Sequence, residues 1–343
     1  MEKAKKSAII GFGGMGQRHY DVYQRLGVEV TAICEWYPEK VQKTLPDFSK
    51  ERVYRDLKTL LAKHGDLAIA SITTNAPTHA EATIACSEAG IPNVLCEKPM
   101  TTNLRDAQRM IEKCQENRTR LAVNHIRRWS PNHLKLRSLI RDSLIGRVRH
   151  FYLSHGSVGL GNNGVHFFDN MRFYAESEPL WVIGFLDKTG TPSTRGPQFK
   201  DPGAFGILLF ENGIRAFVDT SEDAGVRHAF EIVGEYGRVV IEEWGDDWRV
   251  CARKPEDRQR PLTYYIAAMP QVPFELEVKF DIPELTLRAI RELLSGDSIS
   301  CAGEDGKKAL EMAMAFHVSE EQGNQKVFFP LSGEALAKDV PFA

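Results

Sequence analysis

Four glycines near the start of the chain stand at a spacing that suits close contact between backbone and phosphate. The stretch Ile9-Ile10-Gly11-Phe12-Gly13-Gly14-Met15-Gly16 fits the pattern G-x-G-x-x-G, between an apolar run and a helix-like pattern. In such a loop the first glycine makes a tight turn, the second admits a pyrophosphate and the third lets helix pack on strand. The helix N-terminus also offers N–H groups and a favourable dipole. The loop therefore predicts a dinucleotide site.

A carboxylate follows at the position where a dinucleotide's ribose is expected. Glu35 ends the next strand-like run, roughly 20 residues beyond the loop. It can accept hydrogen bonds from both adenosine ribose hydroxyls and would repel the 2′-phosphate of NADP. Trp36 and Tyr37 come next, and neither Arg nor Ser adjoins Glu35 to hold that phosphate. We predict NAD rather than NADP as the cofactor; a solvated glutamate at a strand end is the alternative.

Two further side chains, Lys98 and His166, have the chemistry to act on a substrate oxygen. Lys98 follows the strand-like segment 93–96, and ligands gather at the carboxyl ends of strands in open α/β sheets. Its cation could stabilise charge that develops on oxygen, and the bond to Pro99 is a candidate for the cis form. The imidazole of His166 suits proton transfer near neutral pH. From residue types alone, a surface lysine is the better explanation of the first, and a helix-capping histidine explains the second equally well.

The first third of the chain alternates segments typical of strands and helices. This alternation predicts an N-terminal Rossmann domain, a doubly wound parallel sheet with helices on both faces. The expected strands are 7–12, 28–34, 67–73, 93–96 and 120–125, and the expected helices are 17–26, 57–63, 80–89 and 104–116.

From about residue 150 the pattern changes to longer strand-like runs joined by short turns. Asn212-Gly213 between two apolar runs is a strong hairpin signal. We expect an α+β domain with a mostly antiparallel, open-faced sheet, one face of which is covered by helices at 283–294 and 303–322. The expected domains are an NAD-binding domain, 1–126, and a substrate-binding and oligomerisation domain, 127–343. The runs of this region are 148–154, 205–210, 214–220, 228–234 and 238–243.

Composition excludes several classes of function. The chain has 343 residues with 44 basic and 46 acidic side chains, and this balance gives no sign of a nucleic-acid partner. The six cysteines show no C-x-x-C spacing, which favours reduced thiols and a cytoplasmic location. We find no signal peptide, no apolar run long enough for a membrane span, no metal-ligand motif and no hydrolase motif.

Strands that are apolar on both faces, such as 205–210, predict a homodimer or homotetramer.

Three motifs stand in an order that resembles the Gfo/Idh/MocA family, which includes glucose–fructose oxidoreductase and inositol dehydrogenases. They are the glycine loop, Cys96-Glu97-Lys98-Pro99 and Gly164-Val165-His166-Phe167-Phe168-Asp169, and the likeness extends over nearly the whole chain. The resemblance implies an NAD(P)-dependent enzyme that moves a hydride between the nicotinamide and a secondary alcohol or ketone of a sugar or cyclitol. It also implies that Lys98 contacts the reacting oxygen and that His166 is the general acid/base.

The motifs and the resemblance together give a set of candidate residues. The catalytic candidates are Lys98, His166 and Asn162. The cofactor-binding candidates are Gly11, Phe12, Gly13, Gly14, Met15, Gly16, Glu35, Trp36, Thr73, Thr74, Asn75, His79, Glu97 and Lys98, and His79 is expected to be structural. The substrate-binding candidates are Lys98, His125, Arg128, His155, Asn162, Asn163 and His166.

One position departs from the family pattern and keeps alternatives open. Asn162 stands where the family usually has an aspartate, four residues before the histidine, so a charge that would favour protonated imidazole is missing. One alternative is a regulator that binds NAD without turnover. Another is a nucleotide-sugar or sugar-phosphate ketoreductase, whose anionic substrate would engage Arg195, Lys200 and Arg227. The first two of these cations lie in a Gly- and Pro-containing stretch, 188–202, that is expected to be a long loop.

Overall fold

The computed structural model of the chain describes residues 5–156, 159–190, 196–261, 263 and 269–342. The chain divides into two compact units. The first comprises Met1–Trp129, Ile282–Leu310 and Leu336–Ala343, and the second comprises Ser130–Asp281 and Glu311–Ala335. The first crossing lies close to the boundary expected near residue 127. The return of the chain to the first unit differs from the two continuous domains expected.

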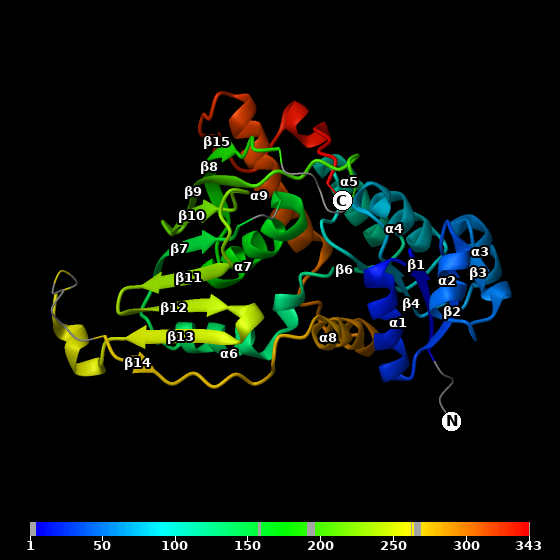
Figure 1. The fold of residues 1–343 in the computed structure, drawn as a ribbon, viewed down its shortest axis with the longest axis horizontal. Helices are drawn as coiled ribbons and strands as arrows, with labels where there is room; N and C mark the ends of the chain where they lie inside the picture. Colours follow the sequence, from blue (N-terminus) through cyan, green and yellow to red (C-terminus); the bar gives the residue numbers. More distant parts are fainter. Residues whose placement is uncertain (1–4, 157–158, 191–195, 262, 264–268, 343) are drawn as a thin grey trace. The chain divides into compact units, whose positions relative to one another are not determined.

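The first unit contains a parallel six-stranded sheet with the order β3-β2-β1-β4-β5-β6. The order reverses between β1 and β4, the switch point at which doubly wound sheets bind nucleotides. This confirms the Rossmann prediction (Figure 1). The strands are β1 (Lys6–Ile10), β2 (Glu29–Cys34), β3 (Val53–Tyr54), β4 (Ile69–Ile72), β5 (Asn93–Cys96) and β6 (Arg120–Val123). The helices between them are α1 (Gly14–Leu26), α2 (Pro38–Thr44), α3 (Leu57–Lys63), α4 (His79–Glu88) and α5 (Leu104–Glu116).

Helix α8 (Ile282–Ser295) belongs to the first unit, so the expectation that it covers the second sheet is wrong. Its apolar stripe, which includes Leu287, Ile290 and Leu293, is buried in one core cluster with Val22 and Tyr23 of α1. Helix amphipathicity predicted that α8 would bury this stripe but carried no information about which sheet would receive it. Figure 1 shows α8 beside α1.

The second unit contains a nine-stranded sheet with the order β14-β13-β12-β11-β7-β10-β9-β8-β15 (Figure 1). In the part of the chain that the structure describes, β7 and β10 pair in parallel and the other neighbours pair antiparallel, which confirms a mostly antiparallel sheet. The strands are β7 (Val148–Ser154), β8 (Pro179–Leu186), β9 (Ala204–Phe210), β10 (Arg215–Asp219), β11 (Ala229–Gly234), β12 (Gly237–Glu242), β13 (Asp247–Ala252), β14 (Gln271–Val272) and β15 (Val327–Phe328). The helices are α6 (Pro131–Arg141), α7 (Val165–Ala175) and α9 (Gly303–Glu321), of which the last begins in the first unit.

The two faces of this sheet differ in burial. Period-2 alternation places Phe151 and Leu208 on a face buried against helices, where the rings of Phe168 on α7 and Phe316 on α9 stack at 5.6 Å. The opposite face exposes apolar side chains, among them Phe205 at 47% and Ile207 at 41%. Among the described residues, no helix is both long and apolar enough to cross a membrane.

Candidate cofactor and substrate sites

The glycine loop joins β1 to α1, and its glycines fall into two kinds. Gly11 has φ +93°, and a Cβ there would lie 2.7 Å from the backbone nitrogen of Thr74. A Cβ on Gly16 would lie 2.2 Å from the carbonyl oxygen of Gly11. A Cβ on Gly13 or Gly14, by contrast, would meet no described atom within 4 Å apart from the adjoining residues and the backbone of α1. Gly11 and Gly16 therefore close the loop, whereas Gly13 and Gly14 leave open backbone that suits a pyrophosphate.

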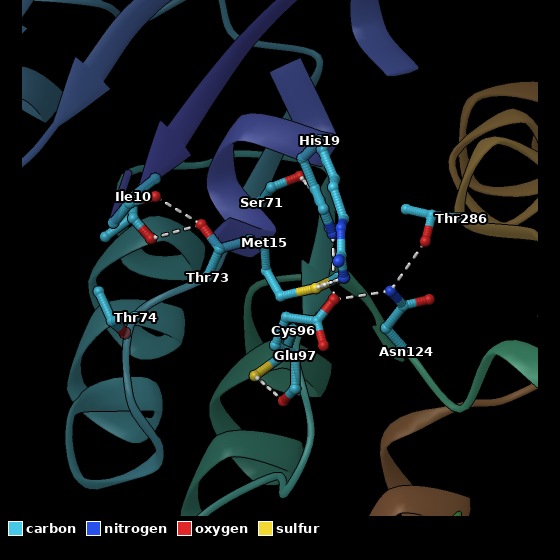
Figure 2. A network of polar contacts seen from close by, with 12 residues as sticks. Ile10, Met15, His19, Ser71, Thr73, Thr74, Cys96, Glu97, Asn124 and Thr286 are labelled. Atoms are coloured by element: carbon cyan, nitrogen blue, oxygen red, sulfur yellow. Dashed lines mark hydrogen bonds and ion pairs between the residues drawn. The ribbon is translucent and has the colours of Figure 1, made fainter. Parts of the chain in front are cut away.

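Thr73, directly after β4, braces this loop from the neighbouring strand. Its hydroxyl donates to the carbonyl oxygen of Gly11 at 2.6 Å and lies 3.1 Å from that of Ile10 (Figure 2). Thr74 and Asn75 follow, and the Thr78 hydroxyl contacts the Thr74 hydroxyl at 2.8 Å and the Asn75 carbonyl at 3.0 Å. These bonds give Thr73 a structural role in the loop.

Glu35 stands directly beside the glycine loop because β2 pairs with β1. Its Oε2 accepts from the Phe12 backbone N–H at 2.8 Å, and its Oε1 accepts from the Tyr37 backbone N–H at 3.1 Å. The negative charge is therefore fixed at the edge of the loop. Trp36 is 77% exposed. An anion in this place is the arrangement that accepts a ribose diol and repels a 2′-phosphate.

Glu97, at the end of β5, is the centre of a buried polar network (Figure 2). Its Oε1 accepts from Nδ2 of Asn124 at 2.7 Å and from Nε2 of His19 at 3.1 Å. His19 Nδ1 lies 2.9 Å from the Ser71 hydroxyl, which lies 2.7 Å from the Tyr23 hydroxyl. The network therefore joins α1, β4, β5 and the end of β6.

The network keeps Glu97 ionised. Burial by itself would raise the pKa of this carboxyl, but hydrogen bonds from His19 and Asn124 and the charge of Lys98 outweigh it and lower the pKa to about 2. Asn124 also contacts the Thr286 hydroxyl of α8 at 3.2 Å. The backbone that carries Lys98 is thus fixed through its neighbour.

Lys98 is partly exposed, and its bond to Pro99 is cis. The turn that carries it is linked to the segment after β4 by buried His79. Nδ1 of His79 lies 3.0 Å from the Pro99 carbonyl oxygen, and Nε2 lies 2.9 Å from that of Thr74. Burial lowers the pKa of His79. These contacts agree with the structural role expected for this histidine.

The remaining candidates of the first unit follow β6. His125 is buried, and Arg128 lies in a short 3₁₀ turn, where it pairs with Asp305 at 3.4 Å. Because the carboxyl ends of parallel strands share one edge, the first unit gathers most of its candidates there. These are the glycine loop, Glu35, Thr73, Thr74, Asn75, His79, Glu97, Lys98 and His125.

The candidates of the second unit lie between β7 and α7. A π-helical turn, Leu160–Gly164, leads directly into α7 and contains Asn162 and Asn163, both partly buried. The N-cap of α7 is Gly164, and His166 lies inside the first turn at 9% exposure. The helix-capping explanation of His166 is therefore wrong.

Sequence reasoning missed Asp201, which holds this turn. Its Oδ1 accepts from the Gly161 backbone N–H at 2.7 Å, and its Oδ2 accepts from that of Asn162 at 2.6 Å. The sequence shows an Asp-Pro-Gly at 201–203 near the end of a long loop, which signals a turn but not its partner.

His155, at the end of β7, belongs to a group of buried rings. Its ring lies 5.7 Å from that of Phe167 and 5.2 Å from that of His228. Nearby on the same unit, Glu243 accepts from Nε2 of His133 at 2.7 Å. No sequence pattern indicates these pairs, because the partners come from separate elements.

Two of the three cations expected for an anionic substrate lie among the described residues of the second unit. Lys200 and Arg227 are exposed to solvent. Arg195 lies outside the described residues.

Known proteins are similar to this chain in sequence and in fold. Residues 5–125 match the model of the GFO_IDH_MocA oxidoreductase family, NAD-binding Rossmann fold. The chain is 25% identical to D-apiose dehydrogenase of Paraburkholderia graminis, with 98% of this chain and 92% of that protein aligned. It is 25% identical to myo-inositol 2-dehydrogenase of Thermotoga maritima, over 92% and 96%.

Solved structures extend the likeness of fold to both units. Levoglucosan dehydrogenase in complex with NADH and levoglucosan has a TM-score of 0.80 at 20% identity, and 96% of this chain and 100% of that chain are covered. Aldose-aldose oxidoreductase from Caulobacter crescentus has a TM-score of 0.76 at 20% identity, over 95% and 100%.

The Rossmann sheet, its glycine loop and the second, mostly antiparallel sheet define a nicotinamide-dependent class of oxidoreductase. Residues 5–125 match the Gfo/Idh/MocA family, which the order of the motifs indicated, and the chain as a whole is similar to the two dehydrogenases named above.

Proposed function

We propose that this protein is an NAD-dependent dehydrogenase or reductase that moves a hydride between the nicotinamide and a secondary alcohol or ketone of a sugar or cyclitol. The observation that carries the proposal is the edge of the first unit's sheet. There an open glycine loop, the anionic Glu35 and the anchored Lys98 follow the carboxyl ends of β1, β2 and β5 of the same parallel sheet. The names of the relatives, an apiose dehydrogenase and an inositol dehydrogenase, support the substrate class.

The residues of the chain have separate roles in this proposal. The glycine loop and the first turn of α1 bind the pyrophosphate, and Glu35 binds the adenosine ribose. Bound NAD supplies the hydride acceptor. Lys98 holds the reacting oxygen, and its positive charge stabilises the negative charge that develops there. In oxidation His166 takes the hydroxyl proton, and Asn162 holds a substrate hydroxyl as a neutral hydrogen-bonding group.

A substrate panel tests the proposal. The purified protein is assayed with NAD⁺ and NADP⁺ against sugars, inositols, sugar phosphates and nucleotide sugars, and NADH binding is followed by its fluorescence. We expect turnover of one substrate class, a preference for NAD⁺, and a loss of roughly 100-fold or more in Lys98→Ala. The preference follows from the charge of Glu35 at the loop.

The same panel separates the enzyme from a regulator. A regulator would bind NADH tightly, turn over no panel member and show the same ligand response in Lys98→Ala and His166→Ala. That combination would overturn the proposal while leaving the Rossmann fold and its cofactor in place.

We further propose that the protein forms a homodimer or homotetramer through the open face of the second sheet. On that face the rings of Phe185 and Phe205 stack at 4.9 Å, and those of Tyr152 and Phe217 at 4.8 Å; Phe217 is partly buried and the other three are exposed. Exposed apolar patches of this kind mark protein interfaces. In sedimentation velocity we expect an oligomer at micromolar concentration and a monomer for Ile207→Glu, with Lys58→Glu, an exposed position on α3 of the first unit, as the control. A monomeric wild type would sink the idea.

A further inference from the structure

We propose that Asp201 is a positioning residue that fixes the turn Leu160–Gly164 and thereby the placement of Asn162 and His166. The inference rests on the proposed function, since it adds to the same candidate site a residue that does not itself touch the reacting atoms. It goes further in giving the loop that ends at residue 203 a specific task. No motif of the chain indicated this carboxylate.

The Asp201 carboxylate accepts hydrogen bonds from the backbone at the start of the turn. Both of its oxygens accept backbone N–H groups, from Gly161 at 2.7 Å and from Asn162 at 2.6 Å. The next residue, Pro202, accepts the N–H of Leu160 at 3.1 Å through its carbonyl oxygen. Three successive N–H groups that have no partner within the turn itself are therefore bound by two successive residues of a distant loop. Short bonds to an ionised acceptor are the stronger kind.

Close packing at two glycines shows that the contact is built into the backbone. A Cβ on Gly159 would lie 2.0 Å from Cγ of Asp201, so any side chain there would displace the carboxylate. A Cβ on Gly203 would lie 2.1 Å from the carbonyl oxygen of Thr220 on the adjoining strand end. Residues 201–203 are thus packed against both the turn and the end of β10.

The position of the turn determines where Asn162 and His166 lie. It is continuous with α7, and within the turn Gly164 and Asn163 both donate to the carbonyl oxygen of Gly159. Asn162 and His166 are four residues apart, so they lie about one turn apart along the same side of the helical segment. A displacement of the start of the turn therefore moves both side chains. A misplacement of about 1 Å is enough to cost roughly 100-fold in rate.

Paired alanine variants test the role of Asp201. Asp201→Ala removes two bonds to the turn. Asp187→Ala is the matched control, because the Asp187 carboxylate also accepts two backbone N–H groups, from Thr189 and Glu222, at the other end of the same loop. Asp201→Asn keeps one acceptor oxygen and serves as the conservative variant. The readouts are amide hydrogen exchange over residues 159–166, the NADH dissociation constant, and kcat with a substrate from the panel.

We expect exchange at Gly161 and Asn162 to rise roughly tenfold or more in Asp201→Ala and to stay at the wild-type rate in Asp187→Ala. We expect kcat to fall roughly 10- to 100-fold in Asp201→Ala, less in Asp201→Asn, with NADH affinity unchanged. Wild-type exchange in Asp201→Ala, or an equal loss of kcat in Asp187→Ala, would overturn the inference. If the wild type turns over no substrate, the proposed function fails separately, and exchange alone decides whether Asp201 holds the turn.

Discussion

The glycine loop of the first unit and the turn 160–164 of the second are alike in topology. They differ in whether an acidic side chain of the protein accepts the backbone N–H groups at the start of the helix. Each follows a strand and leads into a helix whose first N–H groups lack partners within the helix. At the loop, a Cβ on Gly13 or Gly14 would meet no described atom outside the adjoining backbone, and we propose that the N–H groups there bind a ligand phosphate. At the turn, Asp201 already accepts the first N–H groups.

The contrast explains which groups each region offers to a ligand. An open helix start is an anion site made of backbone, and it depends little on side chains. A helix start closed by an internal carboxylate offers no anion site, so only its side chains, Asn162 and His166, are left to act. We therefore propose that the glycine loop binds the cofactor and that the turn 160–164 carries the side chains that act on the substrate.

The largest expected effect separates acting from binding. His166→Ala should lower kcat by roughly 100- to 10,000-fold, because a general acid/base is lost. NADH affinity, which depends on the first unit, should stay unchanged in a fluorescence titration. A parallel loss of NADH affinity would break the comparison, because the turn would then contribute to cofactor binding. His150→Ala, a histidine on β7 that lies outside the candidate site, is the matched control.

The second effect tests the buried network behind Lys98. Glu97→Gln should destabilise the protein by roughly 3 kcal/mol at pH 7, because it removes one partner of a buried ionic network. The folded pKa of about 2 is lowered from 4.5, so the ionised carboxyl contributes stability that is present above pH 4.5 and lost as pH falls towards 2. Urea unfolding of both proteins between pH 7 and pH 2.5 should show the difference narrowing below pH 4.5. A constant difference would contradict the ionised state of Glu97.

The third effect separates the two kinds of glycine in the loop. Gly16→Ala should destabilise the protein by roughly 1–3 kcal/mol, because its Cβ would lie 2.2 Å from the carbonyl oxygen of Gly11. Gly13→Ala should leave the Tm unchanged and weaken NADH binding by roughly tenfold, because its methyl group would occupy open space meant for the ligand. Calorimetry and NADH titration on the pair sharpen the comparison. Unchanged NADH binding in Gly13→Ala would place the phosphates elsewhere.

The smallest effect concerns the choice of cofactor. Glu35→Gln keeps the shape and one acceptor oxygen of the side chain but removes the charge beside the Phe12 N–H. NADPH affinity should rise by roughly tenfold, because repulsion of the 2′-phosphate is relieved, while NADH affinity falls by a few-fold. Parallel titrations with both nucleotides measure the ratio. An unchanged ratio would show that Glu35 does not face the adenosine ribose.

The cofactor region was predictable because its contacts follow from strand order. Glu35 reaches the glycine loop and Thr73 braces it because β2 and β4 both adjoin β1, and alternating strands and helices imply that order. The role of Glu97 as a network centre was not predictable. Its partners His19 and Asn124 come from α1 and the end of β6, and a sequence does not show which polar side chains meet in a core.

The second region was predictable only in its motif. The spacing of Asn162 and His166 is visible in the sequence, but the carboxylate that holds their turn comes from residue 201, at the end of a loop without periodic pattern. The prediction for α8 was wrong for a related reason, since amphipathicity determines which face of a helix is buried but not which sheet it packs against. Long-range contacts made by loops and late helices are what local patterns leave out.

The proposed hydride transfer is tested most directly with NADH that carries two deuterium atoms at nicotinamide C4, by mass spectrometry of the product formed from a ketone of the panel. We expect one deuterium on the carbon that gains the hydroxyl group, in the wild type and not in Lys98→Ala over the same time. Deuterium that stays on the nicotinamide with every ketosugar and keto-inositol tried, although NADH binds, would contradict it.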